Sequence, residues 1–120
     1  MDEKLSQALS RSNFMTTFYN QKQILWQKYQ DDLVYYTQGH EINIDATLIT
    51  FCSTLLQSGR TSVVITDVNN LPFLVSDLQS FLDSILEQYS TVSNDYYAEY
   101  QLLKKNRSIE GLVDLWAKGS

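Results

Sequence analysis

The sequence predicts a helix-dominated α+β fold, in which two long antiparallel helices have a shorter helix and a β-hairpin between them in sequence. Apolar residues recur with a helical period over residues 13–38 and 76–103. Between these stretches lie a short amphipathic segment and two apolar runs that flank Asn69-Asn70. With 120 residues and 43% hydrophobic residues, the chain can bury the core of a single domain over residues 1–120.

The first long helix is expected over residues 13–38, after a polar, frayed start at residues 1–11. Gly39 is a suitable C-cap for it. Phe18 and Leu25 lie beside its main stripe, and Lys22 is the one position of the stripe that is not apolar. That stripe is mostly aromatic and comprises Met15, Tyr19, Trp26, Tyr29, Leu33 and Tyr36.

The segment from Glu41 to Ile44 alternates polar and apolar residues, which predicts a short extended stretch. Asp45 follows as an expected N-cap, and Gly59 would end the helix that it starts. The face of this helix carries Leu48, Phe51, Cys52, Leu55 and Leu56. Because several β-branched residues occur between positions 47 and 54, a strand remains an alternative to the helix.

A hairpin is expected over residues 62–75, with a two-residue turn at Asn69-Asn70 because asparagine tolerates positive φ. Pro72 lacks an amide donor and should occupy an unpaired position. This register predicts a shared face of Val64, Thr66, Val68, Leu71, Phe73 and Val75, and an opposite face with Val63, Ile65 and Leu74.

The second long helix is expected to begin at Ser76, where Gln79 follows three residues later as in a capping box. Its stripe continues to Leu103 in steps of four and three residues and is interrupted only at Glu99. The stripe comprises Leu78, Leu82, Ile85, Tyr89, Val92, Tyr96 and Leu103.

A short C-terminal helix is expected at residues 108–120, started by Ser108. It can dock in a groove of a partner, or fold back onto its own domain. Eight tyrosines and two tryptophans exceed what a small core readily buries, and such rings favour interfaces. The residues expected to bind a partner are Tyr97, Tyr100, Ile109, Leu112, Val113 and Trp116.

The charge pattern argues against nucleic acid as a partner. The formal net charge is −5, and residues 61–103 contain six acidic residues but no lysine or arginine. No apolar run is long enough to span a membrane. The single cysteine, Cys52, cannot form an internal disulfide, and no signal peptide is recognisable, so a cytoplasmic location is expected.

Catalytic and metal-binding chemistry find little support. His40 lacks a carboxylate at a diagnostic spacing, and Cys52 lies on an apolar helical face. Asp67, Asn69 and Asn70 are oxygen-rich, but the glycine and glutamate that an EF-hand loop requires are missing. Turn chemistry explains that cluster, and no cofactor, metal or small-molecule substrate is expected.

The sequence therefore predicts a non-enzymatic protein-protein interaction module, such as a small subunit, adaptor or assembly factor, which can also self-associate into an oligomer. The alternative is an acidic regulator or inhibitor that presents the negative helical face of residues 77–99 to a basic site. Salt distinguishes the two, because binding through that acidic face weakens steeply as ionic strength rises.

Overall fold

The first helix is earlier in the chain than predicted, and it is followed by an unexpected hairpin. In the computed structural model, which describes the backbone of residues 3–119 and the side chains of residues 3–107, α1 spans Glu3–Asp32. Strands β1 (Val34–Thr37) and β2 (His40–Asn43) then pair antiparallel. The prediction of helix up to residue 38 is wrong, because Gln38 and Gly39 take φ values of 51° and 79°. Two consecutive positive φ angles form the tight turn that matches the twist of a hairpin.

The short helix in the middle of the chain is confirmed. Helix α2 spans Ala46–Gln57, and the Asp45 carboxylate accepts a hydrogen bond of 2.7 Å from the amide of Leu48. Gly59 follows with φ of 88°, a conformation that glycine adopts without strain. The N-cap hydrogen bond therefore outweighs the strand propensity of the β-branched residues in this segment.

The second hairpin exists, but its register differs by one residue from the prediction. Strands β3 (Val63–Thr66) and β4 (Pro72–Val75) pair Thr66 with Pro72 and Val64 with Leu74. A one-residue change of register moves every side chain of a strand to the other face. Val64 and Leu74 are consequently exposed together, whereas Ile65 and Phe73 are buried.

Helix α3 spans Leu78–Gly119 in one piece, without a break at Ser108. Its N-cap is Asp77, whose carboxylate accepts from the amide of Ser80 at 3.1 Å, so the predicted cap at Ser76 is wrong. The predicted stripe is correct, since every member of it is buried or half-buried.

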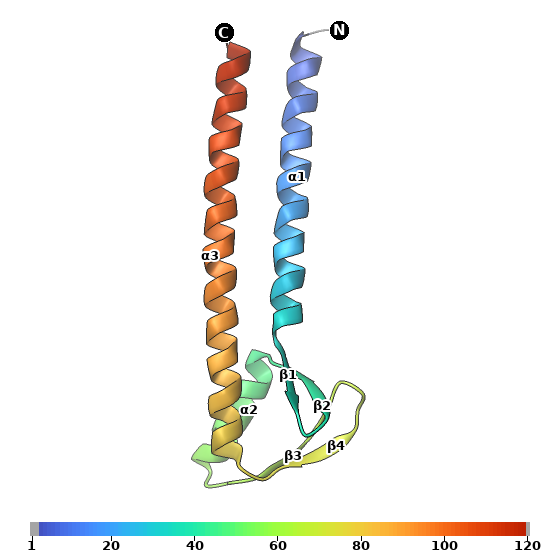
Figure 1. Cartoon of the computed structure of the whole chain (residues 1–120), viewed down its shortest axis with the longest axis vertical. Coiled ribbons are helices and arrows are strands. Elements are labelled where there is room, and N and C mark those ends of the chain that lie inside the picture. Colours follow the sequence, from blue (N-terminus) through green and yellow to red (C-terminus); the bar gives the residue numbers. More distant parts are fainter. Residues whose placement is uncertain (1–2, 120) are drawn as a thin grey trace. The chain divides into compact units, whose positions relative to one another are not determined.

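Figure 1 shows the helices and strands along the chain. The contacts of the chain gather in two units. The hairpin unit is Tyr29–Asn94 and contains both hairpins, α2 and the first part of α3. The two-helix unit consists of the parts of α1 and α3 outside that range. Among the described side chains, every buried apolar residue lies in the hairpin unit. These residues are Leu33, Ile42, Ile44, Cys52, Ile65, Phe73, Val75, Leu78, Phe81, Leu82 and Ile85. The helix-dominated α+β class is confirmed, with two hairpins instead of one.

Candidate protein-interaction surfaces

The pair formed by His40 and Asp67 is the closest approach to a catalytic arrangement. His40 Nδ1 lies 2.7 Å from Asp67 Oδ2, and Asp67 is the one buried charged residue among the described side chains. The other carboxylate oxygen accepts from the amides of Asn69 and Leu71, at 2.8 and 2.9 Å. The His40 ring also stacks on Phe73, with 4.2 Å between ring centroids. The hydrogen bond from His40 is the largest of the contacts that lower the pKa of Asp67.

This pair joins β2 to the loop between β3 and β4. A catalytic histidine oriented by an aspartate also needs a nucleophile at its other ring nitrogen. Within the described side chains, no hydroxyl or thiol is hydrogen-bonded to that nitrogen of His40. A backbone hydrogen bond also joins β2 to this loop, because the amide of Val68 donates to the carbonyl of Glu41 at 2.9 Å. The arrangement therefore positions a loop, and turn chemistry at Asp67 is confirmed.

Cys52 is a core residue. Its side chain is fully buried in the hairpin unit, and this burial raises the pKa of the thiol. A raised pKa keeps the sulfur protonated and unreactive near neutral pH. A shallow hollow of about 430 Å³ beside the start of α2 is lined by Ala46, Thr47, Thr50 and Phe51, none of which is an acid or a base.

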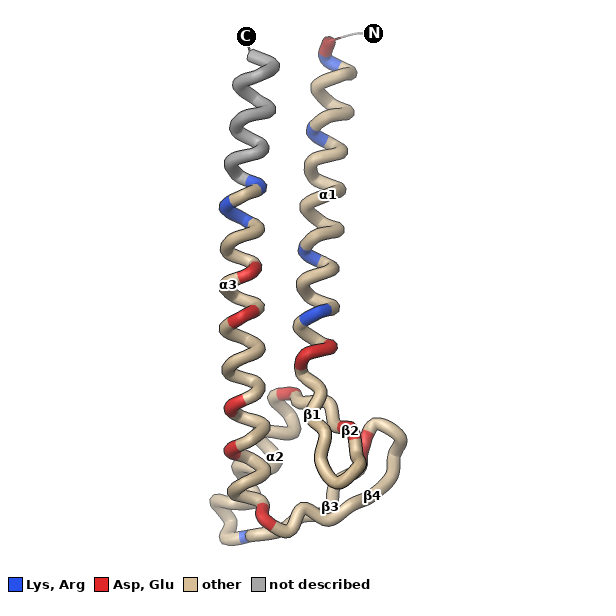
Figure 2. Tube along the Cα trace, viewed as in Figure 1, with Lys and Arg blue, Asp and Glu red and all other residues tan. Residues whose placement is uncertain are grey.

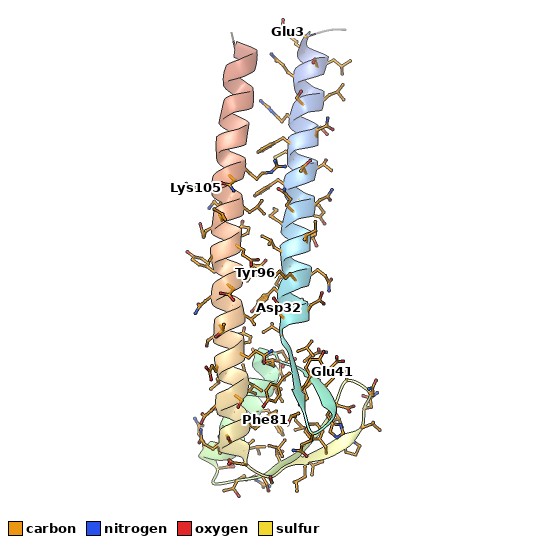
Figure 3. All side chains as sticks on the ribbon, in the orientation of Figure 1. Glu3, Asp32, Glu41, Phe81, Tyr96 and Lys105 are labelled. Carbon is orange, nitrogen blue, oxygen red and sulfur yellow. The ribbon has the colours of Figure 1, made fainter. Side chains whose placement is uncertain are left out.

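Two ring contacts between α1 and α3 show how these helices are oriented in the two-helix unit. The Arg107 guanidinium lies over the Phe14 ring at 5.1 Å, and the rings of Trp26 and Tyr96 meet edge to face at 6.0 Å. Phe14 thus faces a later residue of α3 than Trp26 does, which makes the two helices antiparallel. Figure 3 shows Tyr96 on the side of α3 that faces α1.

An ion pair marks one side of this unit. Lys28 Nζ lies 2.6 Å from Glu99 Oε1, and both side chains are partly exposed. An exposed pair of this kind contributes at most about 1 kcal/mol. The pair shows that the edge of α1 with Lys28 lies next to the edge of α3 with Glu99.

Most of the predicted stripe of α1 is exposed, although its Trp26 contacts Tyr96 of α3. Met15, Tyr19 and Trp26 are between 51% and 58% exposed, whereas Phe18 and Leu25 are half-buried. Of the three exposed residues, Trp26 still contacts Tyr96, whereas Phe18 and Leu25 beside the predicted stripe are better buried. Phenylalanine and leucine have no polar atom to leave unsatisfied, whereas the tyrosine hydroxyl and tryptophan N–H are best placed where water can reach them.

The exposed rings of the two helices lie on the same side, opposite the ion pair. A helix turns by about 100° per residue, so Tyr19 and Trp26 lie roughly half a turn around α1 from Lys28. Tyr97 lies roughly half a turn around α3 from Glu99 by the same count. We call the surface formed by Met15, Tyr19, Trp26 and Tyr97 the ring face.

The residues predicted to bind a partner divide into two groups. Tyr97 is 66% exposed and belongs to the ring face, and Tyr100 is half-buried on the same side of α3. The side chains of Ile109, Leu112, Val113 and Trp116 lie outside the described ones, so their role stays a prediction. Sequence reasoning missed Met15, Tyr19 and Trp26 as surface residues, although Lys22 in their stripe is a signal that this stripe faces water.

A second apolar surface lies on the hairpin unit. Val64 and Leu74 are cross-strand partners that are 62% and 54% exposed, and Val68 and Leu71 are exposed in the loop beside them. We call these four residues the hairpin face. Single exposed apolar residues are normal, but several together are typical of interaction sites.

The charges of the two units are opposite (Figure 2). The hairpin unit contains eight acidic residues and one basic residue, Arg60. The described side chains of the two-helix unit include seven basic residues and three acidic ones. The formal charge of −5 therefore conceals a strong separation of charge along the chain.

Comparison with protein-family models, with curated proteins and with solved structures finds no match to this chain. Among the described residues, no helix has a stretch long and apolar enough to cross a bilayer. In the same part of the chain, no three histidine, cysteine, aspartate or glutamate residues are grouped as metal ligands would be.

Proposed function

We propose that this chain is a non-enzymatic protein-protein interaction module of the cytoplasm, such as a small subunit, adaptor or assembly factor. One observation carries the proposal. None of the 30 residues of α1 is buried. Its exposed large apolar side chains are Leu5, Leu9, Met15, Tyr19, Ile24 and Trp26. A helix gains most of its stability by packing an apolar face, so a helix with no buried residue is best explained by a surface that another polypeptide covers.

Site-specific photo-crosslinking in cells tests this proposal. A photoreactive amino acid in place of Tyr97 should form a covalent product of defined mass with one identified protein. The matched control is the same change at Asn106, which is also exposed but lies roughly half a helical turn away on α3. The proposal predicts no product from that position.

The identified protein must then bind the purified chain directly. Replacing Tyr97 with serine should weaken that binding at least about tenfold, because exposed tyrosines often contribute strongly to an interface. The thermal unfolding midpoint should stay unchanged, since Tyr97 packs little within its own chain. Equal crosslinking at positions 97 and 106, or none at either, would contradict the proposal.

A second candidate function is an acidic regulator that binds a basic site. The excess of acidic residues in the hairpin unit favours it, and Asp83 and Glu87 are exposed on α3. Against it, Glu99 at the end of the proposed acidic face is paired with Lys28. Its signature is a binding constant that falls steeply between low and high salt.

A further inference from the structure

We propose that the ring face of one copy of this chain binds the hairpin face of a second copy, so that copies associate head to tail. The inference rests on the proposed function, because it names the partner that covers the exposed residues of α1. It follows from the side on which the rings lie, from the charges around both faces, and from their apolar character.

The ring face is basic as well as aromatic. Lys22 lies one turn before Trp26 on α1, and Lys104 lies two turns after Tyr97 on α3. The acidic residues on this part of α3, Asp95 and Glu99, lie one turn apart on the opposite side, with the ion pair. The Lys22 ammonium lies over the Phe18 ring at 4.8 Å, and Lys104 is exposed. A partner at the ring face therefore meets aromatic rings and this positive charge, without a neighbouring carboxylate on α3.

The hairpin face has acidic residues close to it in the chain or in contact with it. The backbone carbonyl of Glu41 accepts from the amide of Val68, and Asp77 lies two residues after the end of β4. Arg60 is the one basic residue in the whole hairpin unit. Opposite charges around two apolar surfaces speed their encounter and disfavour wrong pairings.

Charge selects the head-to-tail arrangement among the three possible pairings of copies. Two ring faces would bring Lys22 and Lys104 of both copies together, and two hairpin faces would bring acidic units together. Only a ring face against a hairpin face joins opposite charges and apolar surfaces at once. Such a heterologous contact leaves one ring face and one hairpin face unoccupied, so copies continue to add until a closed ring forms.

The available area indicates a weak interaction. Aromatic side chains can bury 150–250 Å² each, so four side chains that are about half exposed offer roughly 400 Å². A stable interface buries about 800 Å² per partner. Charge attraction must supply part of the affinity, and association should weaken about tenfold or more when salt rises from about 50 to about 500 mM.

Two variants of the full chain test the arrangement. The ring variant carries Tyr19→Ser and Tyr97→Ser, and its matched control carries Ile24→Ser and Leu102→Ser, which are comparably exposed on the ion-pair side. The hairpin variant carries Val64→Thr and Leu74→Lys. Its control is Phe51→Lys, at an exposed position of α2.

Sedimentation velocity and native mass spectrometry over roughly 1 to 200 μM give the result. The wild-type chain and both controls should grow in mass with concentration, whereas each variant alone should stay monomeric. An equimolar mixture of the two variants should form a one-to-one complex, because each supplies the face that the other lacks. Circular dichroism confirms that the variants keep the wild-type helix content.

Three results would overturn the inference. A hairpin variant that associates like the wild type would show ring faces pairing with each other, and a mixture that stays monomeric would show that the faces are not complementary. A monomeric wild-type chain that sediments with phosphatidylserine vesicles would assign the ring face to a lipid surface. The proposed function is tested separately by photo-crosslinking, because a crosslink from position 97 to a different protein is compatible with all three results.

Discussion

At the scale of single residues, Asp67 determines the path of the chain between β3 and β4. Its carboxylate accepts hydrogen bonds from two backbone amides and also bonds to the His40 ring. The turn therefore closes around a side chain and not around Asn69-Asn70 alone. Asn70 still has the positive φ of 63° that the sequence predicts. The predicted register is wrong because of this carboxylate. The pattern of apolar residues does not indicate that a buried aspartate accepts hydrogen bonds from the amides of its own loop.

Asp67 also makes the stability of the hairpin unit depend on pH. Its pKa is lowered in the folded chain, so its contribution is complete above the unfolded pKa of an aspartate and is lost as pH falls through the folded value. The melting temperature should therefore fall when the pH drops below about 4, and Asp67→Asn should make the melting temperature depend less on pH in that range. Thermal unfolding at several pH values measures this dependence, with Asp83→Asn as the exposed control. Equal slopes in both variants would contradict the assignment.

At the scale of elements, the sequence predicts best where one stripe has no competitor. The stripe from Leu78 to Leu103 in α3 is correct throughout, because the apolar residues beside it, such as Phe81, Leu86 and Leu102, do not form a second continuous stripe at helical spacing. In α1, the stripe through Met15, Tyr19 and Trp26 competes with that through Phe18 and Leu25, and both have helical spacing. Only the three-dimensional contacts decide between them. The end of α1 was missed for a related reason, since the tyrosines at 35 and 36 fit a helix and a strand equally well.

The contact stripe of α1 contains one polar residue that is poorly accommodated. Gln21 lies between Phe18 and Leu25 in the direction of α3, and its Oε1 is buried without a hydrogen-bond partner among the described residues. A buried polar atom without a partner costs about 1–3 kcal/mol. Gln21→Leu should therefore raise the free energy of unfolding by about 1 kcal/mol.

Chemical denaturation followed by circular dichroism measures this change. The control is Gln23→Leu, which makes the same substitution at an exposed position of the same helix. It should leave the unfolding midpoint within error of the wild type, because surface substitutions usually change stability by less than about 0.5 kcal/mol. An equal gain from both substitutions would mean that helix propensity, and not the buried amide oxygen, is responsible.

At the scale of the whole molecule, the two units differ in how much apolar surface they bury, and α3 belongs to both. Between Leu78 and Ile85 this helix contains four buried residues, whereas none of its described residues from 95 to 107 is buried. Local opening requires less free energy where few apolar contacts must be broken. The backbone amides of α3 should therefore exchange hydrogen more slowly in the hairpin unit than in the two-helix unit.

Hydrogen exchange with mass spectrometry on overlapping peptides of α3 measures this difference within one continuous helix. At low protein concentration, peptides from residues 78–92 should be protected well beyond those from residues 95–107. At high concentration, the later peptides should gain protection if a second copy covers Tyr97, and the ring variant should lose that gain. Uniform exchange along the helix would show that residues 95–107 are stabilised by contacts other than those seen between α1 and α3, and the exposed rings would no longer require a partner.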